Sequence, residues 1–344
     1  MTRMWPTTSR SLSALAVLTG ATLVLTACGS AETGPEETSE TGGEAVTIES
    51  ALGTATIEEP PERVVTLGMG STGTAIALGV TPVGMEEYPW GSDETGYMPW
   101  IHEAVTAAGD ELPEQFTGGT ELDIEAVLEL DPDVILAPWS GITQEQYDLL
   151  SDIAPTVAYP DKPWSTDWEE QITTIGQALG KPEEAEQAIA DIEEQLATVA
   201  EENPEFADTS FVYAYTEGPG TLGVFMPDEQ RVAMLRKMGL QLDPMVEDLP
   251  ESDGSDWSLI GLENADQLAD ADLMFTFYMD EQTRKEVESQ PLYASIPAVE
   301  RGSLVTSEDA PFVTASSMIN PLTVPWSIDR YVPLIEEAIG KLDD

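Results

Sequence analysis

Residues 182–203 read PEEAEQAIADIEEQLATVAEEN, and this stretch predicts a helix on the order of 30 Å long. Pro182 stands where a first helical turn tolerates proline, and no further Pro or Gly interrupts the stretch. Apolar residues recur every three or four positions and therefore share one face: Ala185, Ile189, Ile192, Leu196 and Val199. We interpret the helical passage 165–203 as a strut between two lobes, with a ligand in the cleft between them. An ordinary surface helix of a single domain has the same pattern.

The length and composition indicate how many domains the protein has and which kinds of partner it can bind. A chain of 344 residues is long enough for two domains. It carries 65 acidic and 13 basic residues, a formal net charge of −52, and its Lys and Arg are not clustered. This excludes nucleic acid as a partner, because phosphate neutralisation needs clustered cations. The acidity has two readings, a salt-adapted exterior or selection for a cationic ligand, and its spread along the whole chain favours the first.

The N-terminus predicts export and lipidation. Arg3 and Arg10 precede an uncharged apolar run, and we predict a signal peptide over residues 1–27. Residues 25–29 read LTACG, which resembles the bacterial lipobox and makes Cys28 the lipid-bearing first residue of the mature protein. Cys28 is the only cysteine, so no intrachain disulfide forms. Residues 28–45 are small, polar and acidic, which is typical of a flexible tether to the outer face of a membrane.

The rest of the chain alternates short apolar runs with amphipathic stretches, the pattern of parallel α/β lobes. The predicted strands stand at 46–48, 54–57, 63–67, 80–85, 134–137 and 156–159 in the first half, and at 211–215, 272–277 and 303–305 in the second. We therefore predict an N-terminal lobe over 46–164 and a C-terminal lobe over 204–344. Residues 86–116 are expected to form an irregular aromatic loop and residues 216–228 a Gly-rich turn region. Such loops bind ligands at the carboxyl ends of parallel strands, although their aromatic rings also serve to cover a core.

A set of short motifs resembles a known family when taken in order. The motifs are PERVV (61–65), ALGVTPVG (77–84), DIE (123–125), LDPDVI (130–135), IAPTV (153–157), IGQALGK (175–181) and PLY (291–293) through IPAV (296–299). Together they resemble the solute-binding lipoproteins that serve ABC importers for iron–siderophores, haem and cobalamin, and most closely the siderophore binders. The resemblance implies a class III substrate-binding fold: two Rossmann-like α/β lobes joined by a single long backbone helix. It also implies docking on an ABC permease through one glutamate per lobe, Glu125 and Glu263.

The choice among ligands depends on charge and aromatic rings. A bare metal ion needs several His and carboxylate ligands, but the chain has one histidine, His102. An anionic ferric catecholate needs two or three cationic contacts, and few basic residues lie in candidate loops: Lys162, Arg231, Arg284 and Lys285. Ferric hydroxamates are neutral or positive and pack on aromatic rings, so we predict a hydroxamate siderophore such as a ferrioxamine. Arg231 is expected to donate to the iron-bound oxygens, although an arginine there also fits a helix surface. The predicted ligand-binding residues are Tyr88, Trp90, Tyr97, Trp100, Trp139, Tyr215, Arg231, Tyr278 and Trp326.

We expect a monomeric binding protein rather than an enzyme, with iron present only in the bound chelate and no other cofactor. The chain has no nucleophile elbow, His-Glu-x-x-His, P-loop or dinucleotide motif. A secreted hydrolase that uses a pair of carboxylates stays open, because acidic residues are so numerous that their number does not exclude such a pair. A lipid-anchored adhesin or scaffold would show repeats, which the sequence lacks. Within the binding class, cobalamin is the alternative ligand, and haem stays open because His102 or a tyrosine is a suitable axial ligand.

Overall fold

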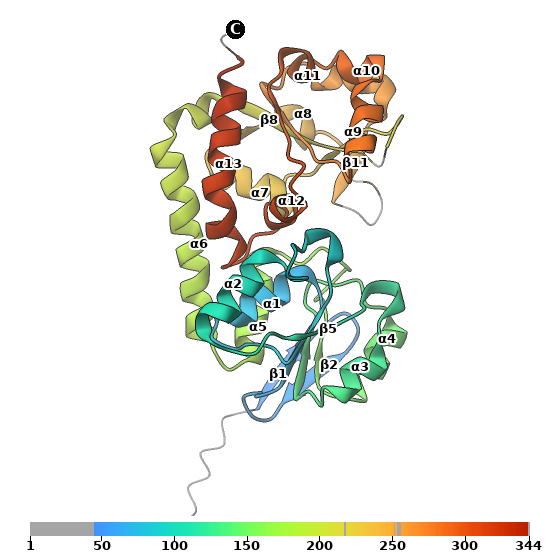
Figure 1. The fold of residues 1–344 in the computed structure, drawn as a ribbon, viewed down its shortest axis with the longest axis vertical. Helices are drawn as coiled ribbons and strands as arrows, with labels where there is room; N and C mark the ends of the chain where they lie inside the picture. Colours follow the sequence, from blue (N-terminus) through green and yellow to red (C-terminus); the bar gives the residue numbers. More distant parts are fainter. Residues whose placement is uncertain (1–44, 217, 251, 253–255, 343–344) are drawn as a thin grey trace, which may run out of the picture. The chain divides into compact units, whose positions relative to one another are not determined.

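A five-stranded parallel sheet forms the centre of the first lobe in the computed structural model, which describes residues 45–342 apart from 217, 251 and 253–255 (Figure 1). The strand order is β5-β4-β3-β6-β7. The bounds are β3 Val64–Thr66, β4 Gly84–Glu86, β5 Glu114–Phe116, β6 Val134–Leu136 and β7 Thr156–Val157. β3 and β6 pair through Val65 and Ile135, and every residue of both strands is buried. Burial on both faces explains why these segments read as nearly continuous apolar runs.

Helices and a hairpin surround this sheet. The helices are α1 Met69–Ala77, η1 Pro89–Gly91, α2 Pro99–Ala108, η2 Gly119–Glu121, α3 Ile124–Glu129, α4 Gln144–Ser151 and α5 Trp168–Ala178. The predicted hairpin is confirmed as the antiparallel pair of β1 Val46–Glu49 and β2 Thr54–Ile57. A capping box fixes the start of α4, because Thr143 and Gln146 each accept a hydrogen bond from the other's backbone N–H. Each helix therefore follows a strand, and the loops that leave the strands gather at their carboxyl ends.

The second lobe is built around a mixed sheet. Its order is β11-β9-β8-β12-β13, with β10 also beside β8. The bounds are β8 Ser210–Tyr215, β9 Gly223–Phe225, β10 Gln241–Leu242, β11 Trp257–Leu259, β12 Leu273–Phe275 and β13 Leu304–Val305. β8, β10, β12 and β13 run parallel, β9 is antiparallel to β8, and β11 is antiparallel to β9. The helices are η3 Pro204–Asp208, α7 Gln230–Lys237, α8 Pro244–Glu247, η4 Leu262–Leu268, α9 Glu281–Glu288, α10 Pro291–Ala294, α11 Pro297–Arg301, α12 Ala310–Ala315 and α13 Thr323–Ile339.

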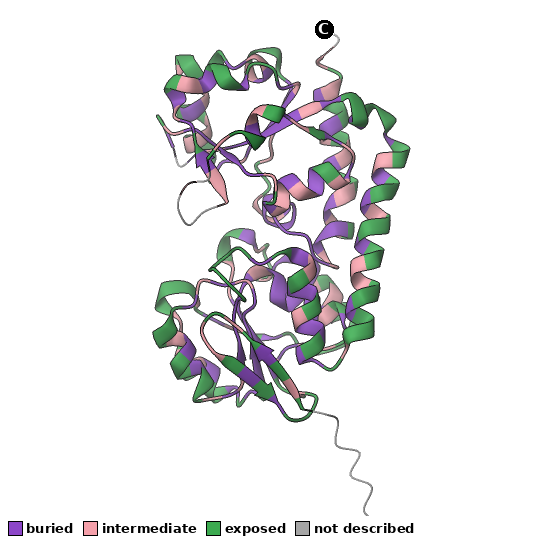
Figure 2. Ribbon diagram, turned by 180° about the vertical axis from the view of Figure 1, so that it is seen from behind, coloured by how far each residue is buried: buried purple, intermediate pink, exposed green. Residues whose placement is uncertain are grey.

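The helix α6, Pro182–Glu202, joins the two lobes (Figure 1). Its predicted apolar face is confirmed, because Ala185, Ile192, Leu196 and Val199 are buried and Ile189 packs against the same core. α6 contacts α5 in the first lobe and both α7 and α13 in the second. One apolar cluster runs from the hairpin through α5 and α6 to α13, while exposed residues cover much of the rest of α6 (Figure 2). The predicted fold, two α/β lobes joined by a long helix, is confirmed.

The helical passage 165–203 is divided, however, into α5 and α6. Gly180 lies in the left-handed region at φ 68°, and the N–H of Lys181 donates to the carbonyl oxygen of Gly176 at 2.7 Å. Pro182 then begins the new helix. A Cβ added to Gly176 would lie 2.4 Å from the Cβ of Ala185, so the two helices cross in close contact. α5 belongs to the first lobe by its packing, and the inter-lobe connection is α6 alone.

The expectation of an irregular loop over 86–116 was wrong for its central part. Residues 99–108 form α2, which begins with Pro99 and ends at Gly109 in the left-handed conformation. Trp100, Ile101 and Val105 form its buried face. Pro99 and Gly109, which indicated a loop, are instead the first residue and the C-cap of this helix. The Gly-rich region 216–228 likewise contains β9.

The predicted signal peptide 1–27 and lipidated Cys28 lie outside the described residues, as does all but the last residue of the predicted tether 28–45. The two lobes lie within one compact unit, residues 42–344. In the described part of the chain, no helix combines the length and the apolar character that membrane crossing requires.

Candidate ligand-binding site

The carboxyl ends of the two sheets face each other. Trp90 follows β4 of the first lobe, and its Nε1–H donates to the carbonyl oxygen of Met279, which follows β12 of the second, at 3.3 Å. The neighbouring Gly91 abuts Thr314, since a Cβ at Gly91 would lie 2.7 Å from the Thr314 hydroxyl. Loops that leave the carboxyl ends of parallel strands therefore meet across the two lobes. In open α/β sheets this edge is where ligands bind.

In the second lobe, four aromatic rings gather at this edge. Tyr215 ends β8, and its ring centroid lies 5.4 Å from that of Trp257, 5.4 Å from that of Phe225 and 6.1 Å from that of Phe277. Tyr215, Trp257 and Phe277 are half-buried, whereas Phe225 is buried. The antiparallel strands β9 and β11 carry Phe225 and Trp257 as direct cross-strand partners, which sets their rings beside Tyr215. We call Tyr215, Phe225, Trp257 and Phe277 the aromatic cluster.

Arg231 lies against this aromatic cluster at the start of α7. Its guanidinium carbon is 4.7 Å from the ring centroid of Phe225 and 5.4 Å from that of Phe277, within cation–π range. Glu229, the N-cap of α7, forms an ion pair with the guanidinium and accepts the backbone N–H of Arg231 at 2.9 Å. The side chain of Glu229 is 3% exposed and that of Arg231 is 18% exposed. The Nε–H of Arg231 has no hydrogen-bond partner among the described residues.

Burial changes the acid–base properties of this pair. It raises the pKa of Glu229 from 4.5 to about 7, an effect that Arg231 opposes and Asp256 reinforces. Burial is the largest effect on Arg231 and disfavours the guanidinium cation, but Glu229, Tyr213 and Asp256 together outweigh it and raise the pKa of Arg231. The nearby phenol of Tyr213 is also buried, which raises its pKa to about 12. Above neutral pH the site therefore holds a half-buried cation in contact with a buried anion.

The first lobe contributes a pair of tryptophans. Trp139 follows β6 and Trp164 follows β7, and their rings meet edge to face with centroids 4.8 Å apart. Trp164 is 43% exposed and has a φ of 60°, a strained conformation for a bulky residue that is typical of ligand-binding loops. Its ring lies over Gly141, where a Cβ would stand 2.5 Å from the indole nitrogen. The sequence reasoning missed Trp164, although Trp164 lies on the loop that leaves β7, as Trp139 lies on the loop that leaves β6.

Tyr88 and Tyr97 have hydroxyls that are engaged within the first lobe. Tyr88 donates to the carboxylate of Glu86 at 2.9 Å, and burial with this neighbouring carboxylate raises the pKa of Tyr88 well above its usual value. The same oxygen of Glu86 accepts the backbone N–H of Gly68 at 2.9 Å. Tyr97 donates to the carbonyl oxygen of Pro113 at 2.9 Å. Both tyrosines are half-buried and hold the loops after β4 in place.

The structure places two predicted site residues in the cores. Trp100 is 2% exposed and packs edge to face with the half-buried Trp326, with centroids 5.4 Å apart. Arg330 covers the ring of Trp326 at 3.6 Å. Tyr278 is 6% exposed, and its hydroxyl lies 2.8 Å from that of the buried Tyr293. We therefore assign Trp100 and Tyr278 to packing and leave them out of the candidate site.

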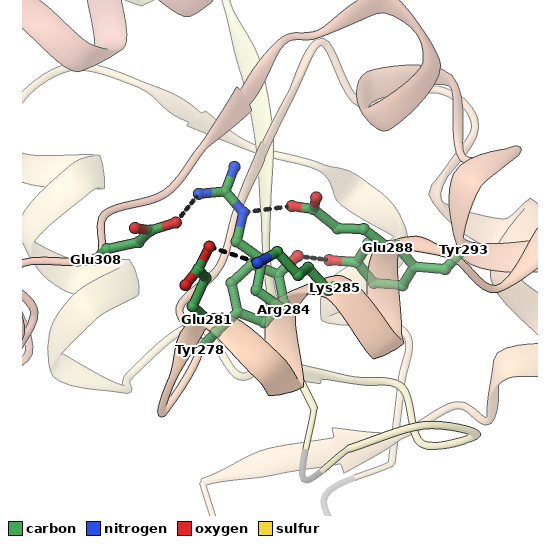
Figure 3. Close-up of polar contacts among 7 residues, drawn as sticks. All are labelled: Tyr278, Glu281, Arg284, Lys285, Glu288, Tyr293 and Glu308. Atoms are coloured by element: carbon green, nitrogen blue, oxygen red, sulfur yellow. Dashed lines mark hydrogen bonds and ion pairs between the residues drawn. The ribbon is translucent and has the colours of Figure 1, made fainter.

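The other basic residues expected near the ligand are paired or exposed. Arg284 bridges Glu288 at 2.9 Å and Glu308 at 2.7 Å, and Lys285 pairs with Glu281 at 2.5 Å (Figure 3). Lys162 is exposed on the loop after β7. Of these four basic residues, Arg231 is the one whose guanidinium lies against the aromatic cluster, so it is the cation of the candidate site.

The two glutamates predicted to dock on a permease are both exposed. Glu125 lies in the first turn of α3, and Glu263 lies in the first turn of η4. Neither forms an ion pair within the described residues. Their carboxylates are therefore available to a partner on the surface of each lobe.

Two surface grooves lie away from this region. One runs between α6 and α13 and is lined by Asp191, Glu194 and Asp329 among others, and the second lies between α5 and α7 around Trp168 and Lys237. Neither contains a predicted ligand-binding residue. Within the described residues no group of three His, Cys, Asp or Glu side chains is arranged to hold a metal ion.

Comparisons with known proteins place this geometry in a family. Residues 64–310 match the family model described as periplasmic binding protein. The chain is 26% identical over 321 residues to the probable siderophore-binding lipoprotein YfiY of Bacillus subtilis, covering 90% of this chain and 94% of that protein. It is 27% identical over 265 residues to the ferric enterobactin-binding periplasmic protein FepB of Escherichia coli, covering 74% and 80%.

A solved structure supports the same conclusion. PiaA of Streptococcus pneumoniae, in complex with ferrichrome, superposes with a TM-score of 0.76 at 29% identity over 86% of this chain and 99% of that one. The match covers both lobes and the helix between them, and the family model spans most of the described chain. The chain belongs to the periplasmic binding protein family.

Proposed function

We propose that this protein captures a ferric hydroxamate siderophore between its lobes and delivers it to an ABC importer. The observation that carries this proposal is the aromatic cluster around Arg231, at the edge where the carboxyl ends of both sheets face each other. Aromatic rings accept the aliphatic linkers of a hydroxamate, and a guanidinium donates to the oxygens around the iron. Trp139 and Trp164 offer a second apolar surface from the first lobe.

Two relatives support different ligand chemistries. PiaA was solved with ferrichrome, an uncharged ferric hydroxamate, whereas FepB is named for ferric enterobactin, an anionic ferric catecholate. We favour the hydroxamate for this chain because Arg231 is already paired with Glu229 and the other cations nearby are paired or exposed. An anionic chelate would find little uncompensated positive charge there.

Lipid anchoring and permease docking are parts of the same proposal. We propose that residues 1–27 are removed, that Cys28 carries lipid and that residues 28–45 tether the body to the outer face of the membrane. The two lobes would then each dock on the permease through one glutamate, Glu125 in the first and Glu263 in the second. The relative YfiY is itself named as a lipoprotein.

A titration of the intrinsic tryptophan fluorescence tests the ligand. We expect ferrichrome or ferrioxamine B to quench the fluorescence at micromolar concentration, since the candidate site contains Trp139, Trp164 and Trp257. Ferric enterobactin, cobalamin and haem are titrated in parallel. Saturable binding of cobalamin or haem, with none of either ferric hydroxamate, would overturn the proposal.

A further inference from the structure

Glu229 lies in contact with the cation that a chelate would meet in the second lobe. Its carboxylate pairs with the guanidinium of Arg231 and accepts the backbone N–H of the same residue at 2.9 Å. Phe225 and Phe277 flank the guanidinium, and Glu229 itself is 3% exposed. The carboxylate is therefore buried against the guanidinium, which is half-buried between two aromatic rings.

A cation that is already paired with an acid contributes little net attraction to an anionic ligand. An anion close to Arg231 gains attraction from the guanidinium, but Glu229 repels it from a similar distance, and the two interactions largely cancel. Asp256 is close enough to act on both members of the pair and adds negative charge. An uncharged or cationic chelate experiences no such repulsion and still accepts hydrogen bonds from Arg231.

We propose that Glu229 sets the charge selectivity of the site, because it cancels the charge of Arg231 before any ligand arrives and so disfavours anionic ferric chelates. This inference rests on the proposed function. It makes Glu229 a specificity-determining residue rather than a mere cap of α7. A capping role alone would predict a loss of stability on substitution, with the same ratio of affinities for the two kinds of chelate.

The test compares wild type with Glu229→Gln, which keeps the shape and the acceptor oxygen but removes the charge. Affinities for ferrichrome and ferric enterobactin are measured by fluorescence quenching at about pH 8, where the carboxyl of Glu229 is ionised. We expect the affinity ratio to shift toward ferric enterobactin by about tenfold or more. The shift should persist in high salt, because a buried pair is screened less than exposed charges.

Glu300→Gln is the matched control, since it removes the same charge from an exposed position on α11 of the same lobe. It should leave the ratio unchanged. An equal ratio in wild type and Glu229→Gln would overturn the inference, as would an equal shift in Glu300→Gln. Failure of wild type to bind any ferric chelate would instead overturn the proposed function.

Unfolding of the Glu229→Gln variant would not end the test. Its fold is checked by circular dichroism and thermal melting before any titration. If it does not fold, Asp256→Asn replaces it, since Asp256 is half-buried and acts on the same pair. We expect a smaller shift of the ratio in the same direction, and an unchanged ratio in a folded Asp256→Asn would count against the inference.

Discussion

The two lobes share an α/β pattern but differ in what they present at the carboxyl ends of their strands. The first lobe has an all-parallel sheet and offers Trp139 and Trp164, rings without a built-in charge. The second has an added antiparallel pair of strands and offers rings around the Arg231–Glu229 ion pair. Both lobes thus offer aromatic rings, whereas the guanidinium and its hydrogen-bond donors come from the second lobe.

This difference indicates a division of labour. A paired guanidinium in a buried setting orients a ligand, because its hydrogen-bond donors have a fixed geometry. A pair of tryptophans would cover the ligand with apolar surface, which accepts many ligand orientations. We therefore expect the second lobe to determine which chelate binds, and the first lobe to determine how tightly any accepted chelate is held.

The largest expected effect is on transport, because both lobes are proposed to dock on the permease. Reversing Glu125 and Glu263 to Arg should reduce transport to background, because each exposed carboxylate is proposed to meet cations on the permease. Binding of the chelate should stay within about a factor of two of wild type, since both residues are surface residues outside the candidate site. Transport of the labelled chelate and fluorescence titration measure the two quantities.

Matched reversals on the same helices control for added positive charge. Glu129→Arg on α3 and Asp266→Arg on η4 are exposed and should transport normally. Loss of chelate binding in the Glu125 and Glu263 variants would show that these residues support the fold rather than docking. A defect from only one of the two would show that the lobes dock unequally.

The second effect is on stability and concerns the charged pair of the second lobe. The pKa of Glu229 is raised by burial from 4.5 to about 7, so the folded protein binds an extra proton between these values. The stability linked to that proton is complete below about pH 4.5 and is lost as the pH rises through about 7. Relative to Glu229→Gln, wild type should lose on the order of 3 kcal/mol of unfolding free energy between about pH 5 and pH 8.

Urea unfolding of both proteins at constant ionic strength measures this difference. Glu300→Gln, which is exposed, controls for the general effect of removing one acid from a chain with a net charge of −52. A difference between wild type and Glu229→Gln that does not change with pH would show that the carboxyl titrates alike in both states. Among the described residues, no ion pair involves Trp139, Trp164 or their loops in the first lobe, so the effect distinguishes the lobes.

The same contrast separates what the sequence predicts from what it does not. The α6 face and the buried strands β3, β6 and β8 follow from local periodicity and apolar runs, which a single sequence displays. The cross-strand pairing of Trp257 with Phe225 joins residues far apart in the chain, and no local sequence pattern predicts it. The aromatic cluster was therefore predicted only in part, through Tyr215.

Glu229 shows the same limit for charge. Among 65 acidic residues nothing in the sequence around Glu229 distinguishes it, and its burial against Arg231, on which its proposed role rests, appears only in the fold. Trp100 shows the converse error, because a tryptophan among Gly and Pro indicates a loop until Pro99 is recognised as the start of a helix. Site residues whose role depends on burial were thus predicted less well than helices and strands, which local periodicity in the sequence indicates.

A third prediction compares how much binding free energy each lobe contributes to the chelate. Trp139→Ala and Trp164→Ala in the first lobe, and Tyr215→Ala in the second, should each weaken chelate binding by about 1–3 kcal/mol. Isothermal titration with ferrichrome measures each loss. Gly141→Ala is a matched perturbation that leaves every ring in the sequence, because its new Cβ would displace the ring of Trp164. Losses confined to Tyr215→Ala would show that the first lobe covers the ligand without holding it.

The smallest expected effect concerns the contact that joins the two lobes at the site. Trp90→Phe keeps an aromatic ring but removes the Nε1–H that donates to the carbonyl of Met279 at 3.3 Å. Trp90 is 37% exposed and Met279 is 55% exposed, so water replaces much of the lost bond and the cost should be about 0.5 kcal/mol. The apparent affinity for the chelate should fall by no more than that amount, with the loss in a faster dissociation rate measured by stopped-flow fluorescence. A loss as large as that of Trp139→Ala would mean that Trp90 contacts the ligand itself, and that the first lobe holds the chelate from two loops rather than one.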